Sequence, residues 1–297
     1  MSIRKLKALI AIADHGSLAR AARVLNLTQS AISMQIGALE DEFGIRLFDR
    51  GRKPLQLTAD GVALLERARE VVRLYDDLGE SLATADRLSG RLVIGAIPGA
   101  LISIIPRALA RLAELHPRLA VRVTNGISET LTTQLMHGEL DAAIISEPRR
   151  LPDKLAWRPF ASEPIMVIAP PGAPYASDAA ALTSLPYIRY NRTFWVGRMI
   201  EAGLRSRGIA LRAAMELDSQ ETIALMVRHG LGVSILPVCD TDLDVYANVT
   251  LLPFGEPPLY RRVGLAAARG SSKTRLAGAL FAELLRTSEQ ASRTRGG

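Results

Sequence analysis

The chain has 297 residues, of which 48% are hydrophobic and 23% are charged, and its formal net charge is +7. A chain of this length and apolar fraction can bury two or three separate cores, which excludes a disordered or fibrous protein. The positive charge favours a nucleic-acid partner only weakly, because basic residues are spread along the whole chain. The single cysteine, Cys239, cannot form an intrachain disulfide, so a sensor with paired thiols is not expected.

The N-terminus has the outward features of a signal peptide, because three basic residues among the first seven precede an apolar run. That run is too short for a secretory core, which needs about 7 to 15 apolar residues. Leu6, Leu9, Ile10 and Ala13 instead have the spacing of an amphipathic helix. No segment approaches the roughly 18 consecutive apolar residues of a membrane span. We therefore expect a cytoplasmic protein that does not enter a membrane.

The next segment has the pattern of two short helices set at an angle by a tight turn. Four apolar residues from Leu18 to Leu25 recur at i, i+3, i+4 and i+7, and Ser17 is placed to cap the first helix. Asn26 is expected to end this helix, and Thr28 is expected to cap the next one. Two helices in this arrangement fit a DNA major groove.

The second helix is predicted to bury Ile32, Ile36, Leu39 and Phe43 on one face. Short side chains then remain on its other faces near the first two turns, where they can contact base edges or phosphates. The candidate DNA-contacting residues are Thr28, Gln29, Ser30, Ser33, Met34 and Gln35. Periodicity alone fits an ordinary pair of packed helices equally well, since any small helical domain buries one stripe per helix.

The continuation over residues 44–58 favours DNA binding. It predicts two short extended segments around a basic tip, which form a wing that can lie along a phosphate backbone. Arg50, Arg52 and Lys53 are the candidate phosphate or minor-groove contacts. A solvated charged loop explains the wing taken by itself, but the helix pair and the wing together indicate a winged helix-turn-helix.

A long helix is predicted to follow, capped by Thr58 and running to about Leu88. One face carries apolar residues at alternating spacings of four and three, the period of a coiled-coil seam. This seam consists of Leu64, Ala68, Val71, Tyr75, Leu78, Leu82 and Ala85. We expect it to pair two copies of the chain, although packing against the C-terminal domain of the same chain would also bury it. Ser89 and Gly90 are expected to end the helix and form a hinge.

From Arg91 onward the predicted strands and helices alternate, which argues for an α/β sheet architecture. Strands are expected over 92–97, 119–124, 142–146, 164–169, 187–190, 213–217, 233–236 and 261–268. Helices are expected over 100–115, 128–137, 194–208, 219–229 and 272–288.

Patterns of catalytic or metal-binding residues are missing from the sequence. The four histidines are isolated, and no complete dinucleotide, P-loop or Gly-x-Ser-x-Gly motif occurs. We therefore expect neither an enzyme, nor a metal site, nor a cofactor.

The first sixty residues closely resemble the winged helix-turn-helix of LysR-type transcriptional regulators. The resemblance rests on Gly-Ser-Leu-x-x-Ala-Ala, Leu-Thr-Gln-Ser-Ala-Ile-Ser-x-Gln-Ile, Leu-Glu-x-x-Phe-Gly-Ile-Arg-Leu-Phe-x-Arg and Leu-Thr-x-x-Gly, all within residues 6–61. It continues more weakly in segments such as 138–144 and 230–237. Ser30 stands where the family usually has proline, and Met34 where it often has a basic residue. The DNA sequence that this helix reads therefore cannot be carried over.

The resemblance implies a winged helix-turn-helix at 1–58, a linker and dimerisation helix at 59–90, and an effector-binding domain at 91–297. That domain is similar to type 2 periplasmic binding proteins, with two Rossmann-like lobes at 91–161 with 266–290 and at 162–265. A small-molecule effector of unknown identity would lie in the cleft between the lobes, where helix N-termini offer N–H groups to an anion. The regulator would bind double-stranded promoter DNA as a homodimer or homotetramer.

Ten residues are candidate effector contacts in this expected cleft, and resemblance in position is what suggests Gly99, Ser128 and Ser146. The ten residues are Pro98, Gly99, Ala100, Ser128, Ser146, Arg192, Thr193, Phe194, Trp195 and Gly232. Turn formation or helix capping explains Gly99, Ser128 and Ser146 as well as ligand contact does, and Ser128 is expected to cap its helix in either case.

The segment around Arg192 is chemically richer. A guanidinium beside the faces of Phe194 and Trp195 could hold a carboxylate and an apolar ring, but both aromatic side chains could equally lie in the core. Glu147 near the cleft could repel an acid or select a cation. The charge of the effector therefore stays open.

Two other classes of protein compete with a ligand-responsive transcription regulator. A solute-binding or enzymatic α/β protein with an accessory helical domain would need a signal peptide or a catalytic constellation, and the sequence indicates neither. An architectural DNA-binding protein without an effector would differ in one measurable property, because no metabolite would raise its melting temperature.

Overall fold

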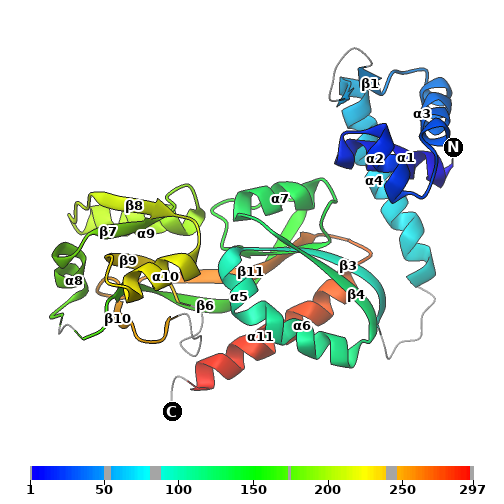
Figure 1. The fold of residues 1–297 in the computed structure, drawn as a ribbon. Helices are drawn as coiled ribbons and strands as arrows, with labels where there is room; N and C mark the ends of the chain where they lie inside the picture. Colours follow the sequence, from blue (N-terminus) through cyan, green and yellow to red (C-terminus); the bar gives the residue numbers. More distant parts are fainter. Residues whose placement is uncertain (1, 50–54, 81–87, 173–174, 239–245, 295–297) are drawn as a thin grey trace. The chain divides into compact units, whose positions relative to one another are not determined.

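A computed structural model describes residues 2–49, 55–80, 88–172, 175–238 and 246–294. The chain divides near residue 86 into two compact units (Figure 1). No helix among these residues is both long and apolar enough to cross a membrane.

The first unit is a winged helix-turn-helix with a long helix behind it. The helices α1 (Ile3–His15), α2 (Leu18–Val24) and α3 (Gln29–Phe43) pack on one another around one apolar core. The strands β1 (Phe48–Asp49) and β2 (Gln56–Leu57) pair antiparallel at the base of the wing. The predicted helix pair and wing are therefore confirmed.

The turn between α2 and α3 follows from two residues. Asn26 has φ 54°, a left-handed conformation that asparagine tolerates better than most residues. Thr28 Oγ1 then accepts a hydrogen bond from the N–H of Ala31 at 3.2 Å, which caps α3 as predicted. Ser17 stands at the N-cap position of α2, but its side chain makes no cap hydrogen bond, so the predicted capping by its hydroxyl is wrong.

The end of α3 differs from the prediction. Phe43 was expected in the core, but it is 43% exposed because α3 ends directly after it, at Gly44 in a left-handed conformation. Glu40 occupies the buried position instead and is 6% exposed. Its Oε1 accepts a hydrogen bond from the N–H of Leu47 at 2.8 Å, which ties the end of α3 to the chain that enters the wing.

The long helix α4 (Ala59–Glu80) follows Thr58, whose Oγ1 accepts a hydrogen bond from the N–H of Gly61 at 3.0 Å. Leu64 and Ala68 pack against the core of the first unit, where α4 lies on α1. Ala68 is 1% exposed and is therefore not available to a second chain, whereas Leu64 is half-buried and its pairing stays a prediction.

The exposed part of the predicted seam lies further along α4. Val71 is 38% exposed and Tyr75 52%; their neighbour Leu74, which the predicted seam did not include, is 54% exposed. The side chain of Leu78 and the residues Leu82 and Ala85 lie outside the described part of the chain.

The second unit contains one mixed sheet with the strand order β4-β3-β5-β11-β6-β9-β7-β8, and β10 pairs with β6. Its strands are β3 (Ser89–Ala96), β4 (Arg118–Asn125), β5 (Ala142–Ser146), β6 (Leu155–Ala169), β7 (Tyr187–Tyr190), β8 (Ala213–Leu217), β9 (Val233–Pro237), β10 (Thr250–Pro253) and β11 (Tyr260–Ala268). Its helices are α5 (Pro98–Ile102), α6 (Ile104–Leu115), α7 (Ser128–Met136), α8 (Asp178–Ser184), α9 (Trp195–Ser206), α10 (Gln220–Arg228) and α11 (Thr274–Thr294).

Two apolar cores divide the second unit into two lobes. Buried residues from 92–160 and 263–284 form the first core, and buried residues from 165–254 form the second. The strand β6 contributes to both cores and pairs antiparallel with β11 from the Tyr260–Pro164 pair to the Ala268–Leu155 pair. Figure 1 shows these two strands running between the lobes. The predicted α/β class with two lobes is confirmed.

Several predicted boundaries in this unit are wrong. Leu88 is not helical, and Ser89 and Gly90 pair with β4, so they begin a strand instead of forming a hinge. The helix expected over 100–115 is broken at Ser103, whose Oγ donates a hydrogen bond to the carbonyl oxygen of Gly99 at 2.7 Å. β6 starts earlier than expected, and α8 and β10 were not predicted.

Candidate DNA-binding surface and effector cleft

The N-terminal part of α3 is available to a partner on the surface of the first unit. Its apolar side, which includes Ile32 and Ile36, is buried against the other helices. The candidate residues Thr28, Gln29, Ser30, Ser33 and Met34 are exposed, and Met34 is 69% exposed. Gln35 is half-buried, and its Oε1 has no hydrogen-bond partner among the described atoms.

The wing is described only at its base. The candidate residues Arg50, Arg52 and Lys53 lie outside the described residues. Next to the base, the side chain of Arg46 is 68% exposed and lies 4.0 Å from the carboxylate of Glu40. Sequence reasoning did not select Arg46, although it is the cation that precedes the first wing strand.

A narrow notch in the second unit brings together six of the ten candidate effector residues. Its volume is about 20 Å³, and Pro98, Gly99, Ser128, Ser146, Phe194 and Trp195 are among the residues that line it. The first four come from the carboxyl ends of strands and the helices that follow them in the first lobe, and the two aromatic residues come from the start of α9 in the second lobe. The notch therefore lies between the two lobes.

Hydrogen bonding in the notch corrects one prediction. Ser128 is the first residue of α7, and its Oγ accepts a hydrogen bond from the N–H of Ser146 at 3.3 Å. Ser128 therefore joins the start of α7 to the end of β5 through its side chain, and the expected helix cap is not formed. A Cβ at Gly99 would lie 2.9 Å from Gln220 Oε1 and 3.2 Å from Arg261 Nη2, so glycine permits a close approach of the two lobes.

The four other candidates lie in different places. Arg192 lines a larger cavity next to the notch, and its guanidinium is 3.8 Å from Glu216. Ala100 is 1% exposed, and Thr193 donates hydrogen bonds from its N–H and Oγ1 to Asn191. A Cβ at Gly232 would lie 2.2 Å from the carbonyl oxygen of Pro186. Neither cavity has these last three candidates among its described lining residues.

The two aromatic candidates have different environments. Phe194 packs partly against the second core and meets Tyr190 edge to face, with ring centroids 5.4 Å apart. Trp195 is half-buried and lines both the notch and the larger cavity.

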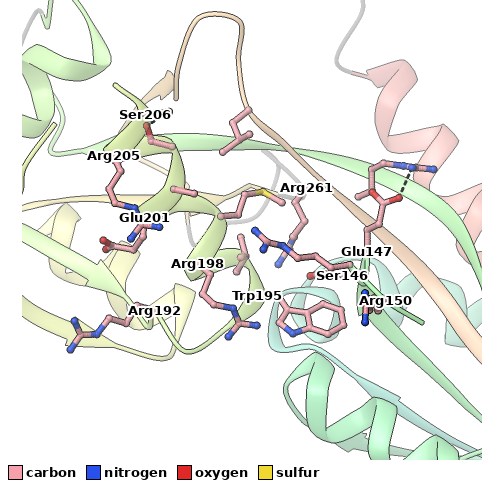
Figure 2. Close-up of a pocket in the computed structure, with 17 residues that line it drawn as sticks. Ser146, Glu147, Arg150, Arg192, Trp195, Arg198, Glu201, Arg205, Ser206 and Arg261 are labelled. Atoms are coloured by element: carbon pink, nitrogen blue, oxygen red, sulfur yellow. Dashed lines mark hydrogen bonds and ion pairs between the residues drawn. The ribbon is translucent and has the colours of Figure 1, made fainter. Parts of the chain in front are cut away.

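The larger cavity has a volume of about 900 Å³ and is lined by many arginines. Figure 2 shows residues of α9 on one side, residues that follow β5 on the other, and Arg261 between them. The arginines that line it are Arg149, Arg150, Arg192, Arg198, Arg205, Arg261 and Arg262. Glu147 and Glu201 also line it, and both are paired: Glu147 with Arg262 at 2.6 Å and Glu201 with Arg189 at 2.9 Å.

Two ion pairs connect the parts of this cleft. Arg261 on β11 and Glu163 on β6 are cross-strand neighbours, and Nε of Arg261 donates a hydrogen bond to Oε2 of Glu163 at 2.7 Å. Their side chains are only 3% and 7% exposed. Arg198 on α9 pairs with Glu129 on α7, so this second ion pair joins the two lobes.

Gln220 is the first residue of α10 and is 1% exposed. Neither atom of its side-chain amide has a hydrogen-bond partner within the described part of the structure. It lies beside Gly99 and Arg261, which both line the notch. Sequence reasoning missed Gln220, Arg198 and Arg261, because nothing in their local sequence shows that they meet across the sheet.

Comparison with known proteins assigns both units. Residues 3–62 match the model described as bacterial regulatory helix-turn-helix protein, lysR family. Residues 85–289 match the LysR substrate binding domain. The chain belongs to the LysR family of transcriptional regulators. The resemblance inferred from the sequence is confirmed.

Named relatives share most of the length of this LysR-family chain. A probable hydrogen peroxide-inducible genes activator of Mycobacterium avium is 31% identical over 304 residues, which cover 97% of this chain and 96% of that protein. The regulator IlvR of Caulobacter vibrioides is 30% identical over 290 residues, which cover 94% of this chain and 96% of that protein. These relatives are regulators, so this LysR-family protein is a ligand-responsive, DNA-binding transcription regulator and not an enzyme.

Solved structures share the same fold. A full-length OxyR variant from Pseudomonas aeruginosa aligns with a TM-score of 0.75 at 24% identity and covers 96% of this chain and 94% of its own. CbnR, a LysR family transcriptional regulator, aligns with a TM-score of 0.64 at 20% identity and covers 97% of this chain and 99% of its own.

Proposed function

We propose that the first unit binds double-stranded promoter DNA by placing the N-terminal half of α3 in the major groove. The observation that carries this proposal is the exposed face of α3, on which polar residues surround Met34 while the opposite face is held in the core. The residues assigned to DNA contact are Thr28, Gln29, Ser30, Ser33, Met34 and Gln35 on α3, with Arg50, Arg52 and Lys53 on the wing. We assign residues 1–58 to this DNA-binding domain.

Self-association is proposed to use the exposed apolar residues of α4. Val71, Leu74 and Tyr75 are large, apolar or aromatic, and solvent-exposed in the single chain. A second copy would remove them from water, and a symmetric pair would present two α3 helices to two DNA half-sites. We assign residues 59–90 to this linker and dimerisation segment, in a homodimer or in a homotetramer built from two such pairs.

The effector is proposed to bind between the lobes of residues 91–297, with lobe boundaries at 91–161 with 266–290 and at 162–265. Pro98, Gly99, Ser128, Ser146 and Trp195 support this placement, because they meet at the notch. The buried amide of Gln220 adds support, since buried polar groups without a partner are rare in native proteins.

The notch of about 20 Å³ has room for little more than one water molecule, so an effector must separate the lobes or occupy the cavity beside the notch. A ligand that binds one lobe arrangement more tightly shifts the population toward it. We infer that this shift changes how the paired chains engage DNA. The protein is proposed to act in the cytoplasm, where promoter DNA is accessible.

The test is footprinting on DNA upstream of the chain's own gene and of its neighbours, with and without a metabolite panel. Arg50→Ala should weaken binding to all sequences and reduce the salt slope by about one, because Arg50 is assigned to phosphate. Gln29→Ala should change the preference among sites, because it is assigned to base edges. Unchanged operator affinity in both variants would refute this docking.

The same panel separates a regulator from an architectural DNA-binding protein. A metabolite that binds the native state raises the melting temperature of the free protein. If DNA is bound but no metabolite stabilises the chain, the effector half of the proposal is wrong. A sensor that closes an intrachain disulfide is excluded by the single cysteine, Cys239, which lies outside the described residues.

A further inference from the structure

The cavity of about 900 Å³ beside the notch carries a large excess of positive charge. Seven arginines and two glutamates line it. The two carboxylates leave no net negative charge, because Glu147 is paired with Arg262 and Glu201 with Arg189. The sequence had left the effector's charge open because of Glu147, and its pairing with Arg262 removes that argument for a cation.

Three of the lining arginines have no counter-ion among the described residues. No acidic group in the described ranges pairs with Arg149, Arg150 or Arg205, and all three are exposed. Arg149 and Arg150 follow β5 in the first lobe, and Arg205 lies in the last turn of α9 in the second lobe. Unpaired cations therefore line the same hollow from two sides. A concave surface with one sign of charge concentrates the opposite sign within it.

The walls between these arginines are apolar. Trp195, Met199 and Leu259 line the cavity together with the small residues Ala202 and Gly203. The volume falls within the range of about 300 to 1,000 Å³ that is typical of small-molecule sites. An apolar wall with separated cationic ends suits a compact organic body that has anionic groups at more than one end.

We propose that this cavity binds a small molecule with two or more anionic groups, each a phosphate or a carboxylate. Arg149 and Arg150 hold one group, Arg205 holds another, and Trp195 and Met199 contact the body between them. Guanidinium groups suit both anions, because they form paired hydrogen bonds with either one. This inference rests on the proposed function and narrows the effector to one chemical class.

The test measures binding to the full-length chain without DNA, by calorimetry and by melting temperature. Butane-1,4-diol bisphosphate and adipate are the probes with an anionic group at each end of an apolar body, and butyl phosphate and hexanoate are their matched one-group controls. Each multi-group probe should bind at least about tenfold more tightly than its control if two sets of arginines act together. The tighter of the two probes distinguishes phosphate from carboxylate.

Variants then locate the binding. Arg149→Gln with Arg150→Gln, and separately Arg205→Gln, should each raise the Kd of the tighter probe at least about tenfold. Arg275→Gln is the matched control, because Arg275 is exposed at the start of α11 and outside the cavity lining. The Kd of this variant for the tighter probe should change less than about twofold.

Three results would overturn the inference: no binding of either multi-group probe at millimolar concentration, no advantage over the one-group controls, or equal weakening by Arg275→Gln. Failure of the proposed function looks different. If an uncharged metabolite stabilises the chain and changes the footprint while the anions do nothing, the regulator stands and the anionic effector is wrong. If the anions bind as expected but no DNA is bound, the anion site stands and the proposed DNA-binding function is wrong.

Discussion

Replacing Glu163 with glutamine removes the carboxylate that neutralises Arg261 and keeps nearly the same side-chain shape. The two side chains are 7% and 3% exposed, and they join the strands β6 and β11 that run between the lobes. Removing the carboxylate of a buried ion pair takes away a counter-ion from the remaining charge, which costs about 3 to 5 kcal/mol. For a unit of this size, that loss lowers the melting temperature by roughly 6 to 20 °C.

Intrinsic fluorescence can follow this unit alone, because both tryptophans, Trp157 and Trp195, lie in it. Urea and thermal unfolding of wild type and Glu163→Gln should therefore report the loss directly. Glu147→Gln is the matched control. Glu147 pairs with Arg262, the next residue on β11, but the two side chains are 43% and 50% exposed. Exposed pairs contribute only about 0 to 1 kcal/mol.

A second variant separates charge burial from packing. Glu163→Leu combined with Arg261→Met removes both charges, and most of the lost stability should return, because well-packed apolar residues often replace a buried ion pair without cost. Equal losses of stability for Glu163→Gln and Glu147→Gln would refute the reasoning, since burial would then make no difference.

Three other predictions concern single positions. Burial raises the pKa of Asp178, but hydrogen bonds, chiefly from Arg207, outweigh burial and hold this pKa below the ordinary 3.8. The stability that the ionised Asp178 contributes is therefore complete above pH 3.8 and is lost in more acidic solution. The melting temperatures of wild type and Asp178→Asn should converge as the pH falls below 3.8. Gly61→Ala should destabilise the first unit, because the added Cβ would lie 2.2 Å from a backbone oxygen. Gly37→Ala on α3 places its Cβ in open space and should stabilise the first unit by about 0.5 to 1 kcal/mol. Unfolding followed by far-UV circular dichroism measures both changes. Leu74→Glu should convert the full-length chain to monomers in light scattering without loss of helix, and an unchanged mass would count against pairing through α4.

The first unit was predictable because its signals are local. Thr28 and Asn26 set the turn before α3 through their own backbone and side-chain preferences, and the apolar spacing of the following residues sets the buried face. The strands β5, β7 and β8 were predicted with their observed bounds, because each is a short segment that alternates along the chain with predicted helices. Such features depend on neighbours within a few positions.

The long strand β6 was only partly predicted, because Pro159 and Pro164 interrupt its pattern and its pairing with β11 comes from a distant part of the chain. The same limit applies to the cleft. Ser128 bonds the backbone of Ser146, and Arg261 meets Glu163 ninety-eight residues away. Arg205 lines the same cavity as Arg149 and Arg150 only once both lobes are folded. Ser146, Arg192 and Trp195, which line that cavity, were selected from the sequence, whereas Arg149 and Arg150, just beyond β5, were not.

DNA binding through α3 is the central claim, and gel retardation at low ionic strength tests it most directly. Duplexes from upstream of the chain's own gene should be retarded by wild type. The variant with Gln29→Ala and Ser33→Ala should keep the same fold and lose its preference for the operator over unrelated DNA. If wild type retards none of these duplexes, or if the variant discriminates among them as wild type does, the account is contradicted.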